Sequence, residues 1–208
     1  MPSGLAAQLK QDTTGLHRQA EQAGVMRDIL AGRVQAGAYV RLLRALYAVY
    51  VALEEELVRH PEAAPVPLAG LARTAALAAD LAHFEGPAWE RRVALVPAGQ
   101  AYAARIRSAA ARRPVLLAAH AYVRYLGDLS GGQTMGRLVA RGLGLAGGAG
   151  TAFYRFDAIG DLTACKQAFR AGVATLPLTD GDAALLIAEA RAAFAANIRM
   201  FEAIGSRV

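Results

Sequence analysis

Apolar side chains recur at steps of three and four along most of this chain, and no segment alternates apolar with polar residues as a half-buried strand would. The longest such pattern is the segment 38–60, AYVRLLRALYAVYVALEEELVRH. It predicts a long core helix whose buried face carries Leu42, Leu46, Val49, Leu53 and Leu57. Three prolines in HPEAAPVP end this helix.

The remaining pattern predicts helices throughout the rest of the chain. A first helix surrounds position 17, and others are expected at 68–83, 98–112, 114–143, 161–172 and 180–204. GLGLAGGAG is predicted to be a flexible loop, and LPLTDGD a turn before the last helix. Because there is no internal repeat and no long linker, residues 1–208 are expected to form one all-α domain of about seven or eight helices.

Composition agrees with a single soluble domain. A chain of 208 residues with 55% hydrophobic content can bury one substantial core. The lone Cys165 cannot form an internal disulfide or a multi-cysteine metal site, which suits a reducing cytosol. There is no signal-peptide pattern and no run of about 18 apolar residues. We therefore expect a cytoplasmic protein without a membrane partner.

The charge balance favours anionic partners. Lysine and arginine number 23 against 17 acidic residues, which gives a net charge of +6 and a pI near 9.9. Nucleic acid, an acidic protein or an anionic small molecule would each suit this charge. The basic residues form no block and accompany no nucleic-acid-binding motif, so nucleic acid is not the expected partner. A basic helical nucleic-acid binder remains an alternative, which would predict salt-sensitive retention on DNA.

Four glycines crowd the segment 124–137, RYLGDLSGGQTMGR. Each glycine inside a helix costs roughly 0.5–1 kcal/mol relative to alanine, so some contact must compensate. Gly127 and Gly131 share a helical face, with Asp128 at its edge. Such a face admits either a flat ring or a second helix at close range, and the spacing alone leaves both open. Gly136 lies nearly opposite Gly127, where packing or bending is its simpler role.

Three of the four histidines are predicted to be structural. His60 precedes a proline in a loop, and His83 lies beside a glycine-proline break, so both are interpreted as surface residues. His120 lies two turns before Gly127, about 10 Å along the helix axis, and is interpreted as a core or supporting histidine.

His17 is the candidate for chemistry. Glu21 lies one turn after it and Lys10 two turns before it, on a common stripe of the first helix. An imidazole beside a carboxylate is typical of a metal-ligating histidine, although a solvated pair has the same spacing. Without a CxxC or HExxH cluster, one histidine cannot build a zinc site, but it can supply an axial ligand to a metal held by a macrocycle.

Several motifs together resemble the heme oxygenase family. AHAYVRYLGDLSGGQ (119–133) is similar to the signature of that family, and TTGLHRQAEQAGVMRDIL to its proximal-histidine segment. LYAVYVALEEEL, DLAHFEGPAW, CKQAFR and AAFAANIRMFEAI follow in the family's order and spacing, so that the resemblance covers nearly the whole chain.

The resemblance implies that heme lies between an N-terminal proximal helix and a glycine-kinked distal helix. His17 is similar to the axial iron ligand, and Glu21 to the acidic residue beside it. Asp128 is similar to the aspartate that anchors a distal water network. The other residues implied on the distal side are Arg124, Tyr50, Gly127, Gly131 and Gly132, with Asn197 further out.

The resemblance also implies the residues around the rest of the heme. Those similar to the groups near its propionates are Lys10, Tyr122, Lys166 and Arg170. Those similar to apolar pocket positions are Met26, Phe194 and Phe201. Two departures affect packing only: His83 replaces a usual aromatic residue, and Ile29 stands where an aromatic residue is common.

The implied reaction is the opening of heme b by O2 and electrons to biliverdin, CO and ferrous iron, with heme as both substrate and cofactor. The propionate clamp favours biliverdin IXα. Since the chain has no flavin, nicotinamide or iron–sulfur motif, electrons are expected from an external ferredoxin-, flavodoxin- or reductase-type donor. The protein is expected to be a monomer. A heme carrier or sensor with the same pocket is the main alternative. Iron acquisition, heme turnover and bilin supply are each compatible with this reaction as the biological role.

Overall fold

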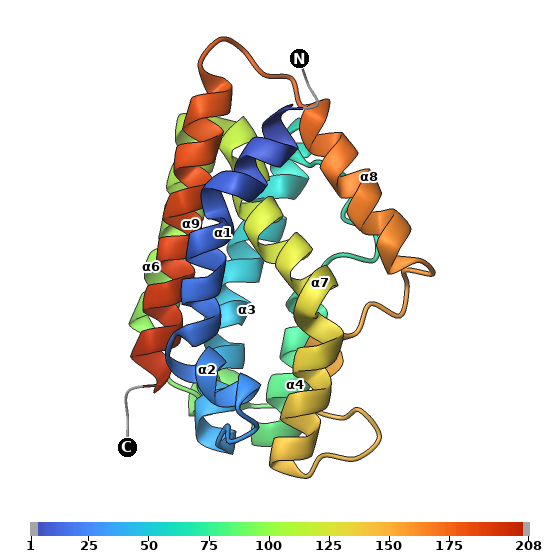
Figure 1. The fold of residues 1–208 in the computed structure, drawn as a ribbon. Helices are drawn as coiled ribbons and strands as arrows, with labels where there is room; N and C mark the ends of the chain where they lie inside the picture. The colour runs from blue at the N-terminus through green and yellow to red at the C-terminus, as the bar shows by residue number, and fades with distance from the viewer. Residues whose placement is uncertain (1–3, 206–208) are drawn as a thin grey trace.

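The computed structural model describes residues 4–205, and in this range it contains nine α-helices, three short 3-10 helices and no strand (Figure 1). The α-helices are α1 (Leu5–Gln22), α2 (Gly24–Leu30), α3 (Ala36–Arg59), α4 (Thr74–Glu85), α5 (Trp89–Arg92), α6 (Pro97–Arg112), α7 (Leu117–Leu143), α8 (Leu162–Ala174) and α9 (Asp182–Gly205). The 3-10 helices are η2 (Pro61–Ala63), η3 (Pro114–Leu116) and η4 (Ala152–Tyr154). The prediction of an all-α fold is confirmed.

The predicted elements differ from the observed ones at a few boundaries. The first helix is divided at Ala23, whose backbone is extended, so that α2 is a separate element. The short helix α5 had no counterpart in the prediction. The helix expected from position 68 begins only at Thr74, because Gly70 has a φ of +77° that no helix allows. These differences account for nine helices where about seven or eight were expected.

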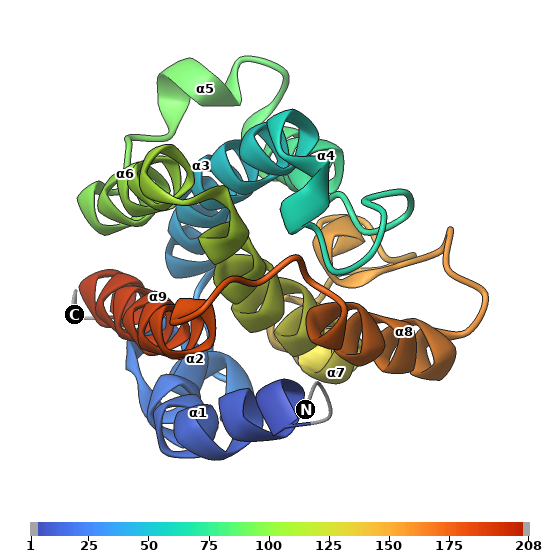
Figure 2. The same ribbon diagram turned by 90° about the horizontal axis from the view of Figure 1, so that it is seen from above.

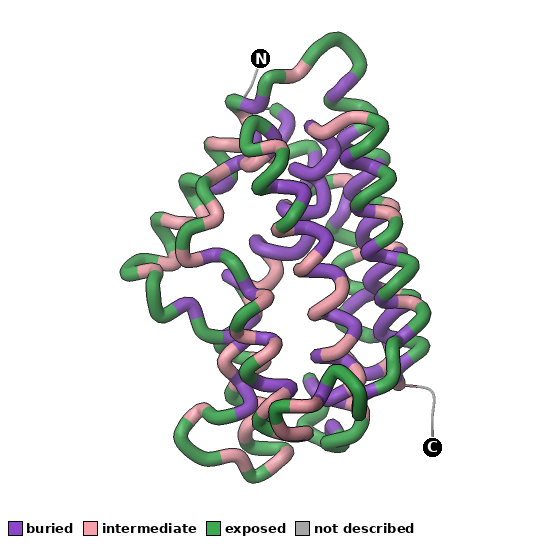
Figure 3. The backbone as a smooth tube through the Cα atoms, turned by 180° about the vertical axis from the view of Figure 1, so that it is seen from behind, coloured by how far each residue is buried: buried purple, intermediate pink, exposed green. Residues whose placement is uncertain are grey.

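Helix α3 is the central element of the core. It packs against α4, α6, α7 and α9, and Figure 2 shows α7 running from beside α3 and α6, past α9, toward α8. Within residues 4–205, α3 is the one helix with the length and apolar composition of a membrane span, and 56% of its most apolar window is buried inside the protein. Figure 3 shows the buried positions gathered along these inner helices. The burial of α3 is therefore that of a core helix.

A close crossing of α2 and α9 forms one end of the molecule. Gly24 has a φ of +38°, and a side chain there would collide with the carbonyl of Phe201. A Cβ atom at Gly205 would lie 2.5 Å from Gly24 Cα. Glycine at both positions lets the two backbones touch, which brings Met26 and Phe201 to the wall of the same cavity.

A buried ionic cluster joins α6, α7 and α9 on the far side of the core. His120 is 0% exposed, as expected for a core histidine, and its Nε2 lies 3.0 Å from Glu189 Oε1. Arg105 donates two hydrogen bonds of 2.8 Å to the same carboxylate. Burial lowers the pKa of His120. Burial acts to raise the pKa of Glu189, but hydrogen bonds from His120 and Arg105 outweigh it and bring that pKa to about 2.

This cluster predicts that the protein loses stability in acid. Below pH 6.5 the unfolded chain protonates His120 more readily than the folded protein does, so the free energy of unfolding falls as the pH falls. A second loss follows between about pH 4.5 and 2, where unfolded Glu189 takes up a proton before the folded carboxyl does. Urea unfolding midpoints measured from pH 8 to pH 3 should decline in these two windows.

Glu189→Gln should weaken the pH dependence of the free energy of unfolding between about pH 4.5 and 2. It should also reduce stability at pH 7, because Arg105 loses its charged partner. Glu55→Gln is the matched control, since Glu55 is exposed and pairs with Arg107 at 3.4 Å on the surface. A stability profile that stays flat from pH 7 to pH 3 would contradict this role of the cluster.

Candidate functional site

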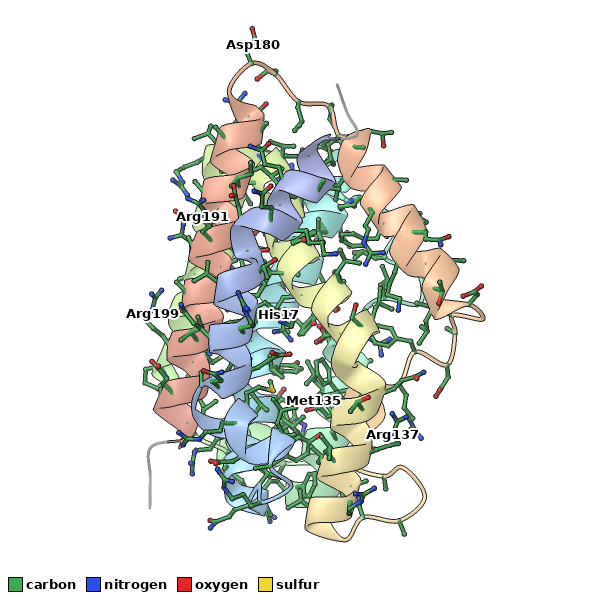
Figure 4. All side chains as sticks on the ribbon, in the orientation of Figure 1. His17, Met135, Arg137, Asp180, Arg191 and Arg199 are labelled. Atoms are coloured by element: carbon green, nitrogen blue, oxygen red, sulfur yellow. The ribbon has the colours of Figure 1, made fainter. Side chains whose placement is uncertain are left out.

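An inner cavity of about 300 Å³ lies between α1 and α7 and is closed behind by α3, η4 and α9. In Figure 4, His17 on α1 and Met135 on α7 lie on either side of it, whereas Arg191 and Arg199 project from the outer side of α9. Most of its lining is apolar. The predicted site residues on its wall are His17, Glu21, Met26, Arg124, Gly127, Asp128, Gly131, Gly132, Phe194, Asn197 and Phe201.

An outer cavity of about 570 Å³ adjoins the inner one and shares His17, Gly127 and Phe194 with it. Its wall carries the cations Lys10, Arg18 and Arg170 together with several small or apolar side chains. Among the described residues, no acidic side chain lines this outer cavity. The combined space therefore has an apolar interior and a positively charged mouth.

His17 presents its imidazole at the junction of the two cavities. Its side chain is 55% exposed, and Nδ1 lies 3.6 Å from Glu21 Oε1, the carboxylate one turn along α1. The ring meets Phe194 of α9 edge-on, with ring centroids 6.1 Å apart. Nε2 has no hydrogen-bond partner within residues 4–205. Also within this range, no three His, Cys, Asp or Glu side chains are grouped to hold a metal, so an axial ligand is the metal role open to His17.

The glycines of α7 fall into two groups. A Cβ atom added at Gly127 or Gly131 would meet no atom within 4 Å, so both face open space in the cavity. A Cβ atom at Gly136 would lie 3.0 Å from Tyr154 Cβ, and one at Gly132 would lie 3.5 Å from Tyr154 O. Gly136 thus has the packing role predicted for it, and Gly132 packs against η4 while lining the inner cavity. Helix α7 is continuous from Leu117 to Leu143 and bends along its length in Figure 1.

Replacing Gly127 with alanine should stabilise the protein while reducing the space for a ligand. The substitution meets no clash, and helix propensity favours alanine by roughly 0.5–1 kcal/mol. The added methyl group would nevertheless stand in the cavity, so binding of a flat ligand should weaken by about tenfold or more. Gly15→Ala is the control, since Gly15 is an exposed α1 position with equally open surroundings and lines neither cavity. Thermal melts and a heme titration of both variants would separate the two effects.

A hydrogen-bonded network lies behind the glycines. Arg124 Nη2 donates to Asp128 Oδ1 at 3.0 Å, and Arg124 Nη1 donates to Asn197 Oδ1 at 3.1 Å. The hydroxyl of the fully buried Tyr50 donates to Asp128 Oδ2. Burial raises the pKa of Asp128 well above its ordinary value, and burial lowers the pKa of Arg124. The network holds a carboxyl group with a raised proton affinity at the wall of the inner cavity.

The other predicted residues lie at the mouth, with one exception. Lys10, Tyr122 and Arg170 line the outer cavity. Lys166 lines neither cavity: it is half-buried on α8, and its carbonyl accepts a hydrogen bond from Arg170. One helical turn separates the two, and only Arg170 reaches the cavity wall.

Sequence reasoning missed several residues of the wall. Phe153 and Tyr154 of η4 close the inner cavity from behind, together with Met135 of α7 and Leu42 of α3. At the mouth it missed Arg18, although this cation follows His17 directly. The aromatic run FYRF after the glycine-rich loop was the available signal for η4, but nothing local to it indicates which helix it would contact.

Fold and cavity together define the class of protein. It is an all-helical ligand-binding protein whose slot is lined by a glycine helix, offers one exposed imidazole and has cations at its mouth.

Comparison with known proteins identifies the family. A heme oxygenase family model matches residues 3–203. The heme oxygenase of Guillardia theta is 38% identical over 205 residues, which cover 97% of this chain and 86% of that protein. The solved structure of heme oxygenase-1 from the cyanobacterium Synechocystis in complex with heme is 40% identical with a TM-score of 0.89, covering 95% of this chain and 90% of that one. The solved structure of the heme oxygenase of Leptospira interrogans is 38% identical with a TM-score of 0.90, covering 95% of this chain and 98% of that one. This chain belongs to the heme oxygenase family and is an oxidoreductase.

Proposed function

We propose that this protein binds heme between α1 and α7 and opens it oxidatively to biliverdin, CO and ferrous iron, with O2 and external electrons. The observation that carries the proposal is the junction of the two cavities, where an exposed histidine faces a helix whose glycines leave open space. The relatives named above support it, including one solved in complex with heme.

The residues present fit a heme molecule. Heme is a broad apolar disc with an iron at its centre and two carboxylates on one edge. Open space above Gly127 and Gly131 accommodates the disc, and His17 offers a ring nitrogen without a protein partner to its iron. Lys10 and Arg170 at the outer cavity suit the carboxylates by charge. Burial of the disc contributes about 25 cal/mol per Å² of apolar surface.

Each side chain then has a definite task. Bound heme supplies the iron that activates O2 and the ring that is opened. His17 would hold the iron from the α1 side, with its ring oriented by Glu21 Oε1. On the α7 side Asp128 would exchange protons, since its carboxyl has a raised pKa and is anchored by Tyr50 and Arg124. The bulk of the apolar lining would keep the disc dry and in one plane.

The cations at the mouth would set the rotation of the disc and hence the edge that is attacked. Lys10 and Arg170 line the outer cavity from α1 and α8, with Lys166 one turn from Arg170. Because these cations would favour one orientation of the carboxylate edge, we infer biliverdin IXα as the product.

We further infer an external, acidic electron donor of ferredoxin, flavodoxin or reductase type. The net charge of +6 would steer such a donor to the surface and would make the association sensitive to salt. We also infer that the protein is a cytoplasmic monomer with a single domain.

The test is reduction of the heme complex in air. Ascorbate, with catalase present to remove free peroxide, should replace the heme absorption bands by those of biliverdin, and a ferrous chelator should trap about one iron per heme. A heme carrier or sensor would keep its heme spectrum under the same electron supply. Persistence of intact heme over many donor equivalents would refute the proposal.

A further inference from the structure

A third cavity, of about 580 Å³, lies on the opposite face of α7 from the proposed heme slot. Its walls are this outer face of α7 and the segment 148–162, which runs through η4 to the start of α8. In Figure 4, Met135 lies toward the inner cavity, whereas Arg137 projects from the other side of the same helix. Among the described residues, only Tyr154 lines both the inner and the third cavity. The volume is typical of a site for a small molecule.

Two guanidinium groups give the third cavity a positive charge. Arg137 on α7 is exposed and donates a hydrogen bond of 3.1 Å to the neutral hydroxyl of Thr134. Arg155 comes from the facing segment, and its Nη1 lies so close to the backbone that a Cβ atom at Gly148 would stand 2.5 Å from it. Asp157, whose carboxylate is 3.8 Å from Arg155 Nε, is the one acidic side chain on the described wall. Two cations and one anion leave a site suited to a negatively charged ligand.

The floor of the third cavity is apolar and held in place by the fold. The rings of Tyr154 and Phe156 are nearly fully buried, and the half-buried Ile159 and Leu162 complete the floor. The guanidinium of Arg73, a residue that is 7% exposed, lies 4.0 Å from the centre of the Phe156 ring and fixes it. Apolar surface between two cations fits an amphipathic ligand that carries carboxylates.

The wall favours an iron-free ligand over a second heme. Among the described residues, no histidine, cysteine or methionine lines the third cavity. Tyr154 would ligate iron only as a phenolate, and burial raises the pKa of its hydroxyl, so that it stays protonated. An open-chain tetrapyrrole combines apolar rings with two carboxylates and contains no iron. The proposed product of this protein belongs to that chemical class.

We propose that the third cavity is a binding site for biliverdin, with its carboxylates on Arg137 and Arg155 and its rings on the apolar floor. The inference rests on the proposed function, which supplies the ligand, but it concerns a site outside the heme slot. Because Tyr154 separates the two cavities, heme and biliverdin should be bound at the same time. Product held on the outer face of α7 would leave the slot free for the next heme.

Titration of added biliverdin into the ferric heme complex is the first test. Without a reductant no heme is opened, and the heme fills the inner cavity. We expect about one equivalent of biliverdin to bind, seen as induced circular dichroism of the bilin, while the heme absorption stays unchanged. Arg137→Gln and Arg155→Gln should each weaken this binding by about three- to tenfold. Both side chains are exposed, so the melting temperatures of these variants should stay near that of the native chain.

Two further variants separate a built site from general attraction to a basic protein. Asp157→Asn removes the one carboxylate from the described wall and should tighten biliverdin binding by about twofold. Arg141→Gln is the matched control, because Arg141 is an exposed cation one turn beyond Arg137 on α7 and lines none of the three cavities. The dissociation constant of biliverdin should be the same in this variant as in the native chain.

Glycine-selective NMR locates the ligand. Zinc protoporphyrin can fill the heme slot for this measurement, since zinc has no redox chemistry. Added biliverdin should shift the amide signals of Gly136, Gly148 and Gly160, which line the third cavity, and leave that of the exposed Gly15 in place.

Four results would overturn the inference: no saturable binding, displacement of heme by biliverdin, equal weakening by Arg141→Gln, or tighter binding of a second heme than of biliverdin. Failure of the proposed function would be seen separately, as intact heme during reduction in air. The biliverdin titration uses added ligand and no reductant, so it gives its own result in that case.

Discussion

Replacing His17 with alanine should remove the proposed axial ligand of the heme iron and abolish most heme opening. The imidazole is the one histidine side chain on the wall of either cavity, and its Nε2 has no competing partner within residues 4–205. We expect heme affinity to fall by about 100-fold or more, and the ligand-field bands of the ferric complex to change. The measurement is a heme titration with absorption and electron paramagnetic resonance spectra.

Free imidazole offers a direct check on this assignment. The His17 side chain is 55% exposed, so added imidazole can enter the space it leaves and should restore the native spectrum of the His17→Ala complex. His60→Ala is the matched control, because His60 pairs with Glu62 at 3.4 Å and lines neither cavity. Unchanged spectra in His17→Ala would reject the assignment.

Replacing Asp128 with asparagine should leave heme binding nearly intact and suppress biliverdin formation. Asparagine preserves the shape of the side chain and can still pair with Tyr50 or Arg124, but it cannot exchange a proton. Loss of a proton-exchanging group costs about 10²–10⁴-fold in rate. Single-turnover absorption measurements would show heme consumed slowly or converted to products other than biliverdin.

The protonation of Asp128 should also appear in the pH profile of the native protein. Because burial raises its pKa well above the ordinary value, the proton is lost at a higher pH than from a free aspartate, and the corresponding limb of the rate profile should vanish in Asp128→Asn. Asp180→Asn, a substitution in the exposed loop before α9, should change neither rate nor profile. A normal biliverdin yield from Asp128→Asn would contradict the proton role.

Helical periodicity was enough to place most of the fold. The segments expected at 98–112, 161–172 and 180–204 match α6, α8 and α9 to within two residues. Periodicity failed where a single backbone conformation decides the boundary, as at Gly70 before α4 and Ala23 between α1 and α2. Such conformations depend on tertiary contacts, which no local pattern contains.

The candidate site was predictable where its residues share a helix face or a motif. Gly127, Gly131 and Asp128 came from spacing on one helix, and they line the inner cavity together. Tyr154 could not be found in this way, because η4 is held at the cavity by a long-range contact. The backbone N–H of Ala152 donates to Asp80, which lies 72 residues earlier in the chain. Lys166 shows that spacing can also mislead. It lies one helical turn from Arg170, which suggested that both contact the heme propionates, but it lines neither cavity.

The glycines of this protein are needed for two different reasons. Gly24 and Gly172 face backbone atoms so closely that any larger residue would force the backbones apart and destabilise the fold, so a screen for folded protein alone should retain them. Gly127 and Gly131 face nothing, and the same screen would let them drift to alanine, which helices prefer. What distinguishes them from the equally open Gly15 is their place on the wall of the inner cavity, and a library sorted first for folding and then for heme uptake should keep glycine at 127 and 131 only in the second sort.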